Sequence, residues 1–173
     1  MKHLLLLCTL LLVSCGFHLQ GPVQVAPALH KLYFQSANPY GLLSRYLKED
    51  LKLSNVILVN TPQAASATLH IIQEDTAQHL LSVSSTQQTR QYSLILSATF
   101  QIMDAKGRII LPSQRLNEAR TITIQANQVL ASSNEASLLY EGMQRALAYD
   151  IMNRLASREV SLLLAREIKM SRP

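Results

Sequence analysis

The sequence predicts an α+β fold, a two-layer sandwich in which two helices pack on a four-stranded, mostly antiparallel sheet. Three observations support this prediction. Two segments, one near residue 40 and one after residue 132, carry apolar side chains at the helical period. Long stretches between them alternate polar and apolar residues, and turn-forming residues separate neighbouring segments. The resulting order β-α-β-β-β-α places both helices on one sheet.

The composition is that of one globular domain with an apolar extension. Of the 173 residues, 48% are hydrophobic and 16% are charged. Five glycines and six prolines exclude collagen-like and low-complexity chains. The formal net charge of +5 favours an acidic partner, but no block of like charges indicates nucleic acid. We therefore expect no nucleic-acid partner.

Residues 1–14 predict a secretory signal peptide. Lys2 and His3 precede an apolar run from Leu4 to Val13, and Ser14 follows as a small residue. Ten residues rise about 15 Å as a helix, which is half of a bilayer's hydrocarbon core. This segment is therefore expected to be removed and not to span the membrane permanently.

The end of that run, Leu12-Val13-Ser14-Cys15, resembles the bacterial lipobox. The resemblance implies cleavage before Cys15 and covalent diacylglycerol and acyl groups on its thiol and amino group, which together hold a protein on a membrane. Gly16 follows the cysteine where Asp favours inner-membrane retention, so the resemblance implies the outer membrane. The alternative is an ordinary cleavage site with an unmodified cysteine nearby. Because Cys8 lies in the removed segment, we expect no disulfide.

Residues 15–28 are expected to form a lipidated N-terminus and tether, because Gly21, Pro22 and Pro27 interrupt any helical period. A first strand is predicted from Leu29 to Ser36. Asn38 as N-cap and Pro39 as first helical residue then predict a helix from Pro39 to about Leu53. Its apolar half comprises Tyr40, Leu42, Leu43, Tyr46, Leu47, Leu51 and Leu53.

Four extended segments follow this helix. The short apolar run Asn55 to Asn60 is typical of a buried strand. Ala67 to Asp75 is expected to pair with Gln91 to Met103, so that the connection Ser82 to Thr89 projects beyond the sheet. Asp104 to Arg108 predicts a hairpin turn, after which Arg115 to Gln125 returns as the last strand. The alternation leaves a strand face open to water, with Ser97, Thr99, Gln101, Thr121 and Thr123 on it.

A capping box in Ser132-Ser133-Asn134-Glu135 predicts a helix from Ser133 to about Ala156. Its core row comprises Leu139, Met143, Leu147, Ile151 and Leu155. Leu138, Tyr149 and Met152 fall on the other side, either as ordinary half-buried surface or as partner contacts. We expect a domain over residues 29–158, followed over 159–173 by a basic amphipathic tail or a continued helix.

No sequence motif indicates an enzyme. HExxH, CxxC, P-loop, GxGxxG and GxSxG patterns are all absent. The mature chain keeps His18, His30, His70 and His79, none at a spacing that pairs two on one helix face. We therefore expect no catalytic residue, no metal and no cofactor apart from the acyl groups on Cys15.

Four segments, in order, resemble the lipopolysaccharide-assembly lipoprotein family LptE. They are Cys15-Gly16-Phe17-His18-Leu19-Gln20-Gly21, Asn38-Pro39-Tyr40-Gly41-Leu42-Leu43-Ser44, the turn Lys106-Gly107-Arg108, and the helix over 141–155. The resemblance implies two helices on a four-stranded sheet and a plug inside an LptD-type outer-membrane β-barrel that assists barrel assembly and binds lipopolysaccharide. The domain would lie on the periplasmic side or in the barrel lumen.

In some members of that family, basic residues on the hairpin and on the loop before the last helix are thought to meet lipopolysaccharide. Here residues 82–88 and 126–135 contain no Lys or Arg. The nearest candidate ligand-binding residues are Lys106 and Arg108, supported by Arg90 or Arg120, and the competing interpretation of each is a solvated charge. Two alternative functions are a pilot or interaction lipoprotein of another envelope machine and an anchored periplasmic hydrolase.

Overall fold

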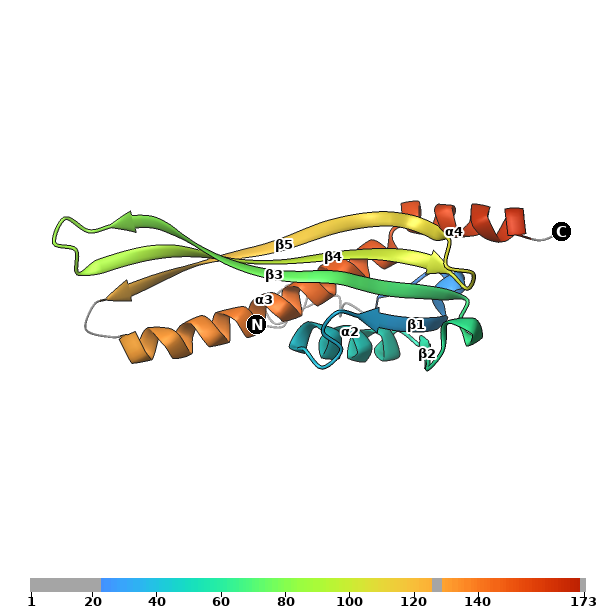
Figure 1. The fold of residues 1–173 in the computed structure, drawn as a ribbon, viewed down its shortest axis with the longest axis horizontal. Helices are drawn as coiled ribbons and strands as arrows, with labels where there is room; N and C mark the ends of the chain where they lie inside the picture. Colours follow the sequence, from blue (N-terminus) through green and yellow to red (C-terminus); the bar gives the residue numbers. More distant parts are fainter. Residues whose placement is uncertain (1–22, 126–128, 172–173) are drawn as a thin grey trace, which may run out of the picture.

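The computed structural model describes residues 23–125 and 129–171 (Figure 1). The signal peptide and Cys15 lie outside the described residues. The elements are η1 (Pro27–Leu29), β1 (Lys31–Ser36), α2 (Leu42–Leu53), β2 (Ile57–Val59), η2 (Pro62–Ala64), β3 (Ala67–Val83), β4 (Thr89–Asp104), β5 (Ile109–Gln125), α3 (Val129–Ala156) and α4 (Arg158–Ser171). The predicted α+β class is confirmed.

The sheet has five strands in the order β2-β1-β3-β4-β5, so the predicted four-stranded sheet is one strand short. The strand predicted in the apolar run Asn55 to Asn60 is present as β2, which the four-strand description left out, but its side chains are exposed or half-buried and not buried. β1 lies between β2 and β3 and runs parallel to both, while β3, β4 and β5 pair antiparallel. The sheet is mixed because α2 is a crossover connection that returns the chain in the direction of β1. The edge strand β2 is partly open, with Ile57 exposed.

Three strands are far longer than an ordinary strand. β3 and β5 have 17 residues each and β4 has 16, so each spans roughly 55 Å at about 3.3 Å per residue. β1 pairs only with the first part of β3, from Ala67 to Ile71. Beyond that point β3, β4 and β5 continue together, because Thr89 at the start of β4 still pairs with Gln125 at the end of β5. Of the connection predicted to project, only the loop 84–88 extends past the strands (Figure 1).

The helix α2 begins at Leu42, three residues after the predicted Pro39. Residues 38–41 form a turn instead, in which the Asn38 carbonyl oxygen accepts the Gly41 amide at 3.2 Å and the Ser44 hydroxyl at 2.6 Å. A Cβ on Gly41 would lie 2.5 Å from the Asn38 side chain, so a larger residue there would have to displace that side chain. Tyr40 is consequently 97% exposed and, like Leu53 at the other end, is not part of the apolar face.

The helix α3 begins at Val129, before the predicted capping box, so Ser133 is an internal helical residue whose carbonyl oxygen accepts the Ser137 hydroxyl. A capping-box sequence does not mark the first turn of a helix when the residues before it, here 129–132, also adopt helical geometry. The predicted core row is confirmed from Met143 to Leu155. Met152, assigned to the outer side, is buried as well.

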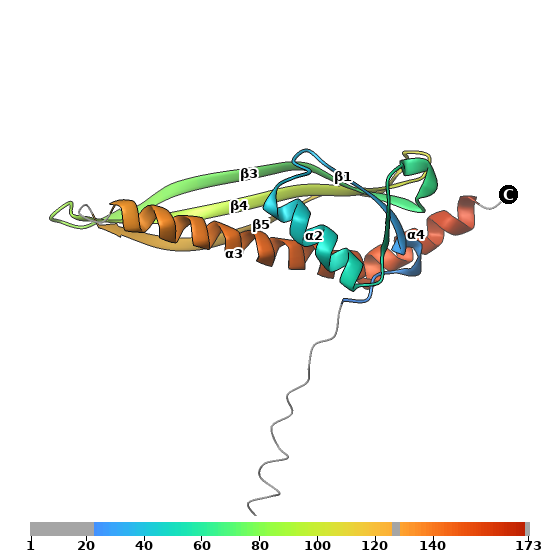
Figure 2. The ribbon, with the colours of Figure 1, turned by 90° about the horizontal axis from the view of Figure 1, so that it is seen from below.

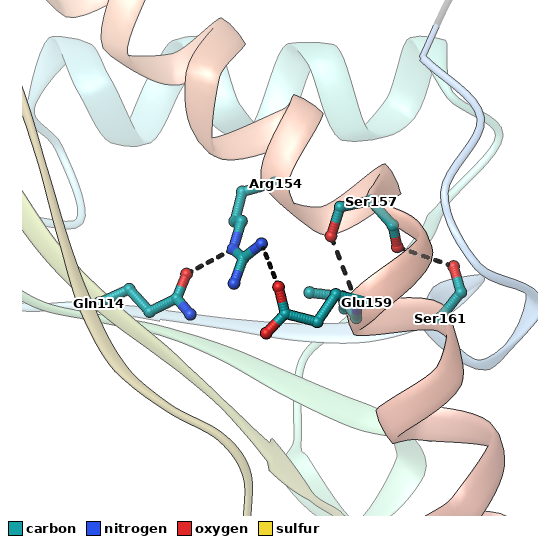
Figure 3. Close-up of polar contacts among 6 residues, drawn as sticks. Gln114, Arg154, Ser157, Glu159 and Ser161 are labelled. Carbon is teal, nitrogen blue, oxygen red and sulfur yellow. Dashed lines mark hydrogen bonds and ion pairs between the residues drawn. The ribbon is translucent and has the colours of Figure 1, made fainter.

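The chain has a third helix, α4, where two helices were predicted. Ser157 separates α4 from α3, and its hydroxyl accepts the Val160 amide at 3.3 Å. Arg154 joins the two helices to the sheet, because its guanidinium donates to Gln114 on β5 at 2.6 Å and to Glu159 at 2.8 Å (Figure 3). Val160 and Leu164 are buried in the main core.

The core lies between the sheet and the helices α2 and α3, which cover one face (Figure 2). Its buried side chains come from every layer. On the sheet they are Leu32, Leu69, Ile71, Leu94, Leu96, Ala98, Phe100, Ile102, Leu111 and Ile122, and on the helices Leu43, Leu47, Leu51, Met143, Leu147, Ile151 and Leu155. Val25 and Ala26, ahead of η1, are also buried in it.

We predict that Leu147→Ala lowers the free energy of unfolding by about 2–5 kcal/mol, because Leu147 is fully buried between α3 and the sheet. Leu138→Ala is the matched control, since Leu138 lies on the same helix and is 70% exposed; its effect is expected to stay within about 0.5 kcal/mol. Urea denaturation followed by circular dichroism measures both. Equal losses would contradict this assignment of the core.

Candidate functional site

The face of the sheet opposite α2 and α3 is polar along β4 and β5. No helix within residues 23–125 and 129–171 covers it (Figures 1 and 2). Cross-strand register places Ser93, Ile95, Ser97, Thr99 and Gln101 of β4 beside Arg115, Asn117, Ala119, Thr121 and Thr123 of β5 on this face. We call these ten residues the open face. The prediction of one strand face open to water is confirmed.

Ser97 departs from the expected exposure, being only 5% accessible. It lies on the middle strand, directly beside Asp75 of β3. The Arg115 guanidinium on β5 reaches 3.2 Å from the Asp75 carboxylate, so this ion pair bridges the two outer strands across β4. Thr99 and Gln101 are half-buried, while Thr121 and Thr123 are exposed. The open face is therefore a hydrogen-bonding surface with one charged crosslink.

The β4–β5 turn is held together by Asp104. Its Oδ1 accepts the amides of Lys106 and Arg108, both at 2.8 Å, and its Oδ2 accepts Arg108 Nε at 2.7 Å. Gly107 has a φ of +81°, a left-handed geometry that favours glycine. Burial raises the pKa of Asp104, but the hydrogen bonds from Arg108 and Lys106 and the Arg108 charge outweigh it and hold that pKa below its ordinary value. The Arg108 charge is thus locally compensated, whereas the Lys106 side chain is exposed.

The four basic residues predicted as ligand contacts do not come together. Arg90 pairs in register with Val83 near the tip of the β3–β4 hairpin. From Arg90 to Asp104, 104 − 90 = 14 residues along β4 separate it from the turn by roughly 46 Å. Arg120 lies beside Leu94, closer to Arg90, and its guanidinium is 3.0 Å from Glu118. Lys106 and Arg108 share one end of the molecule, and Arg90 and Arg120 belong to the other half.

Sequence reasoning missed a polar cluster that joins α2 to α3. The Tyr46 hydroxyl donates to Glu141 at 2.9 Å, and the guanidinium groups of Arg45 and Arg145 lie 5.5 Å and 4.5 Å from the Tyr46 ring centroid. Arg45 belongs to the same helix as Tyr46, so the Arg145 contact and the hydrogen bond to Glu141 are the ones that join α2 to α3. Tyr46 and Glu141 are 95 residues apart in the chain, so no local pattern signals the pairing.

Glu74 is a second group that the sequence did not reveal. It lies on β3 opposite Ala98, on the helix-facing side of the sheet. Its Oε1 is buried without a hydrogen-bond partner among the described residues, and burial raises the pKa of this carboxyl. This half-buried carboxyl lies just beyond the part of β3 that pairs with β1. No described side chain of the helices donates a hydrogen bond to its Oε1.

Residues 23–125 and 129–171 contain neither a cluster of side chains suited to a metal ion nor a helix suited to span a membrane. His30, His70 and His79 are not brought into any group of three or more His, Cys, Asp or Glu suited to a metal ion. His18 lies outside the described residues. None of the described helices is both long and apolar enough to cross a bilayer.

These observations define an elongated α+β sandwich whose sheet has one face covered by helices and one polar face (Figures 1 and 2). A family model described as LptE, Lipopolysaccharide-assembly, matches residues 29–155. An LPS-assembly lipoprotein LptE of Yersinia enterocolitica is 35% identical over 161 residues, which cover 90% of this chain and 77% of that protein. The chain belongs to the LptE family.

Solved structures of other lipoproteins have a similar fold. The rare lipoprotein B of Shewanella oneidensis is 28% identical, with a TM-score of 0.66 over 76% of this chain and 97% of that one. A lipoprotein B of Nitrosomonas europaea, 21% identical, has a TM-score of 0.67 over 90% of this chain and 97% of that one. The second likeness concerns the fold alone, and it includes most of the described elements.

We predict that Asp104→Asn lowers the free energy of unfolding by about 1 kcal/mol at pH 7, since a partly exposed carboxylate gains modestly from such hydrogen bonds. The pKa of Asp104 is depressed in the folded chain, so its contribution is present above the ordinary value of 3.8 and is lost as the pH falls through the folded value. Urea denaturation at pH 7 and pH 2.5 should show the two chains converging in stability at the lower pH. A difference that persists there would assign the loss to the substitution itself.

Proposed function

We propose that this protein is an outer-membrane lipoprotein, anchored through acyl groups on Cys15, that plugs an LptD-type β-barrel, assists the assembly of that barrel and so serves lipopolysaccharide transport to the cell surface. The observation that carries the proposal is membership of the LptE family, with relatives named LPS-assembly lipoprotein LptE at 32–35% identity. The protein acts as a non-enzymatic binding partner in this role.

The polar open face supports a position inside a barrel. The interior of a large outer-membrane barrel is polar and hydrated, whereas its outer surface carries an apolar band about 25 Å tall. Thr121, Thr123, Thr99 and Gln101 offer hydroxyl and amide groups that hydrogen-bond to such a wall or to its water. Strands of roughly 55 Å are long enough to extend through the full height of that band.

Lipopolysaccharide contact is a finer part of the proposal, and it centres on the β4–β5 turn. Lys106 offers an ammonium group there, next to an Arg108 guanidinium that is already bound to Asp104. Phosphate groups of lipid A carry multiple negative charges, so charge-assisted hydrogen bonds form where the site excludes water. Arg90 and Arg120 act separately from this turn, given their distance along β4.

We predict that photocrosslinkers at Thr99, Gln101, Thr121 and Thr123 capture the barrel in cells, because all four lie on the open face. Ser97 is a poor crosslinking position because it is buried. Glu49 on α2 is the control from the helical layer of the molecule, exposed but on the other side of the sheet. Mass spectrometry of the adducts identifies the partner. Crosslinks only to soluble periplasmic proteins would contradict the plug and favour the pilot alternative.

We predict that replacing both Lys106 and Arg108 by Ala lowers lipopolysaccharide capture severalfold while the purified barrel complex keeps its one-to-one composition. The double Arg90→Ala, Arg120→Ala variant removes the same charge from the other half of the molecule. Capture of lipopolysaccharide by the complex in detergent measures both. Unchanged capture in the turn variant would assign binding to other residues, and loss of the complex would make the turn a structural contact.

A further inference from the structure

The helix α4 presents a basic and apolar stripe to solvent. Arg158, Leu162 and Arg166 recur every four residues and so share one side of the helix. Leu162 is 52% exposed, and at about 100° per residue it lies across the helix from the buried Val160 and Leu164. One side of α4 is therefore buried in the core, and the stripe formed by Arg158, Leu162 and Arg166 lies on the side that faces solvent.

The stripe carries two positive charges, on Arg158 and Arg166. Glu159, the acidic residue of α4 whose side chain the structure describes, is already paired with Arg154 at 2.8 Å (Figure 3). Neither Arg158 nor Arg166 forms an ion pair with any residue that the structure describes. A partner for this surface must therefore offer negative charge close to an apolar phase.

The position of α4 relative to the start of the described chain points to a membrane as that partner. Val25 and Ala26 are buried in the core, and η1 contacts α4, so the chain enters the domain beside this helix (Figure 2). Cys15 precedes Val23 by 23 − 15 = 8 residues, which extend over at most ~28 Å. With the acyl groups on Cys15, the membrane surface lies within that distance of Val23. α4 itself is about 21 Å long, so it stays near the lipid headgroups.

We propose that the stripe of Arg158, Leu162 and Arg166 docks α4 on an anionic phospholipid surface. The inference rests on the proposed lipid anchorage at Cys15. Leu162 enters the boundary between headgroups and acyl chains, while the two guanidinium groups bind headgroup phosphates on either side of it. An acyl anchor limits the distance between the domain and the membrane, but it does not set the angle between the long sheet and the membrane surface. Docking of α4 adds the second contact that fixes the orientation of the long sheet.

The test uses the absence of tryptophan from the chain, because Leu162→Trp then creates a single fluorescent reporter. The acylated full-length mature chain is reconstituted into phosphatidylethanolamine–phosphatidylglycerol vesicles with brominated acyl chains. The Leu162→Trp chain is expected to show blue-shifted emission and quenching by bromine. Leu138→Trp is the matched control, because Leu138 is also exposed and lies 156 − 138 = 18 residues, about 27 Å, from the end of α3 nearest α4. It is expected to stay unquenched.

The charge dependence is tested on the same reporter. Arg158→Gln and Arg166→Gln should each shift the equilibrium between docked and undocked α4 about fivefold, the usual effect of one basic residue at an anionic surface. Replacing phosphatidylglycerol by phosphatidylcholine should release the helix as well. Two results would contradict the proposed docking. One is equal quenching of both tryptophan reporters. The other is quenching of Leu162→Trp that does not change when the arginines are replaced or the lipid charge is removed.

Anchorage is read separately, by mass spectrometry of the N-terminal peptide and by flotation with the vesicles. A chain that is acylated and floats, but whose Leu162→Trp reporter stays unquenched, contradicts the docking of α4 and leaves the proposed function intact. A chain that carries no acyl groups and does not float contradicts the anchorage itself, and the docking inference fails with it.

Discussion

The structure depends on one-sided burial of a long antiparallel ribbon by α3. β3, β4 and β5 extend for roughly 55 Å, and three strands exposed on both faces would not hold together in water. α3 has 28 residues and is about 42 Å long, so it lies along much of that length. Its buried row from Met143 to Leu155 packs with Leu94, Phe100 and Ile102 of β4 in one core. Because a slip of one residue would move these side chains to the other face, this packing also fixes the strand register.

Because helices cover only one face of the sheet, the other face, which includes the open face of β4 and β5, is left to solvent. With most apolar residues of β4 and β5 packed toward α3, their alternate residues, except Ile95 and Ala119, face outward as hydroxyl, amide and charged groups. Arg115 and Asp75 connect the outer strands across β4, and the exposed Pro112 lies on the edge strand β5, where a missing amide donor disturbs the ladder least. A protein that binds inside a hydrated lumen needs this kind of surface, stiff and polar, more than it needs a pocket.

The two ends of the molecule differ in how firmly packing and hydrogen bonds hold them. At one end, Arg154 and Ser157 join α3, α4 and β5, and the β4–β5 turn is closed by Asp104. At the other end, the β3–β4 hairpin extends beyond the reach of β1 and exposes Leu80, Leu81 and Val83. Local stability follows packing, so the hairpin end is expected to open before the end that carries α4. In the proposed plug, the well-supported end faces the lipid anchor and the hairpin end is free to adapt to the barrel.

The sequence by itself determined the features that depend on neighbours along the chain. Alternation from Tyr92 to Ile102 predicted a strand with one wet face, the period from Met143 to Leu155 predicted the buried helix row, and the Asp104–Arg108 segment predicted the turn. Short ordered signatures also sufficed for the LptE resemblance, which the family match over residues 29–155 confirmed. Each of these signals is local, because side-chain direction follows directly from backbone period.

Only the tertiary structure decided what depends on distant segments. β2 was placed at the edge of the sheet, parallel to β1, and α2 began at Leu42 because Asn38 and Ser44 close a turn around Gly41. α4 was separated from α3 at Ser157 and packed on the core through Val160 and Leu164, while Arg154 of α3 binds both Gln114 on β5 and Glu159 on α4. The basic residues that seemed one group in the sequence were placed in opposite halves, since a strand rises by about 3.3 Å per residue and keeps the ends of a hairpin far apart.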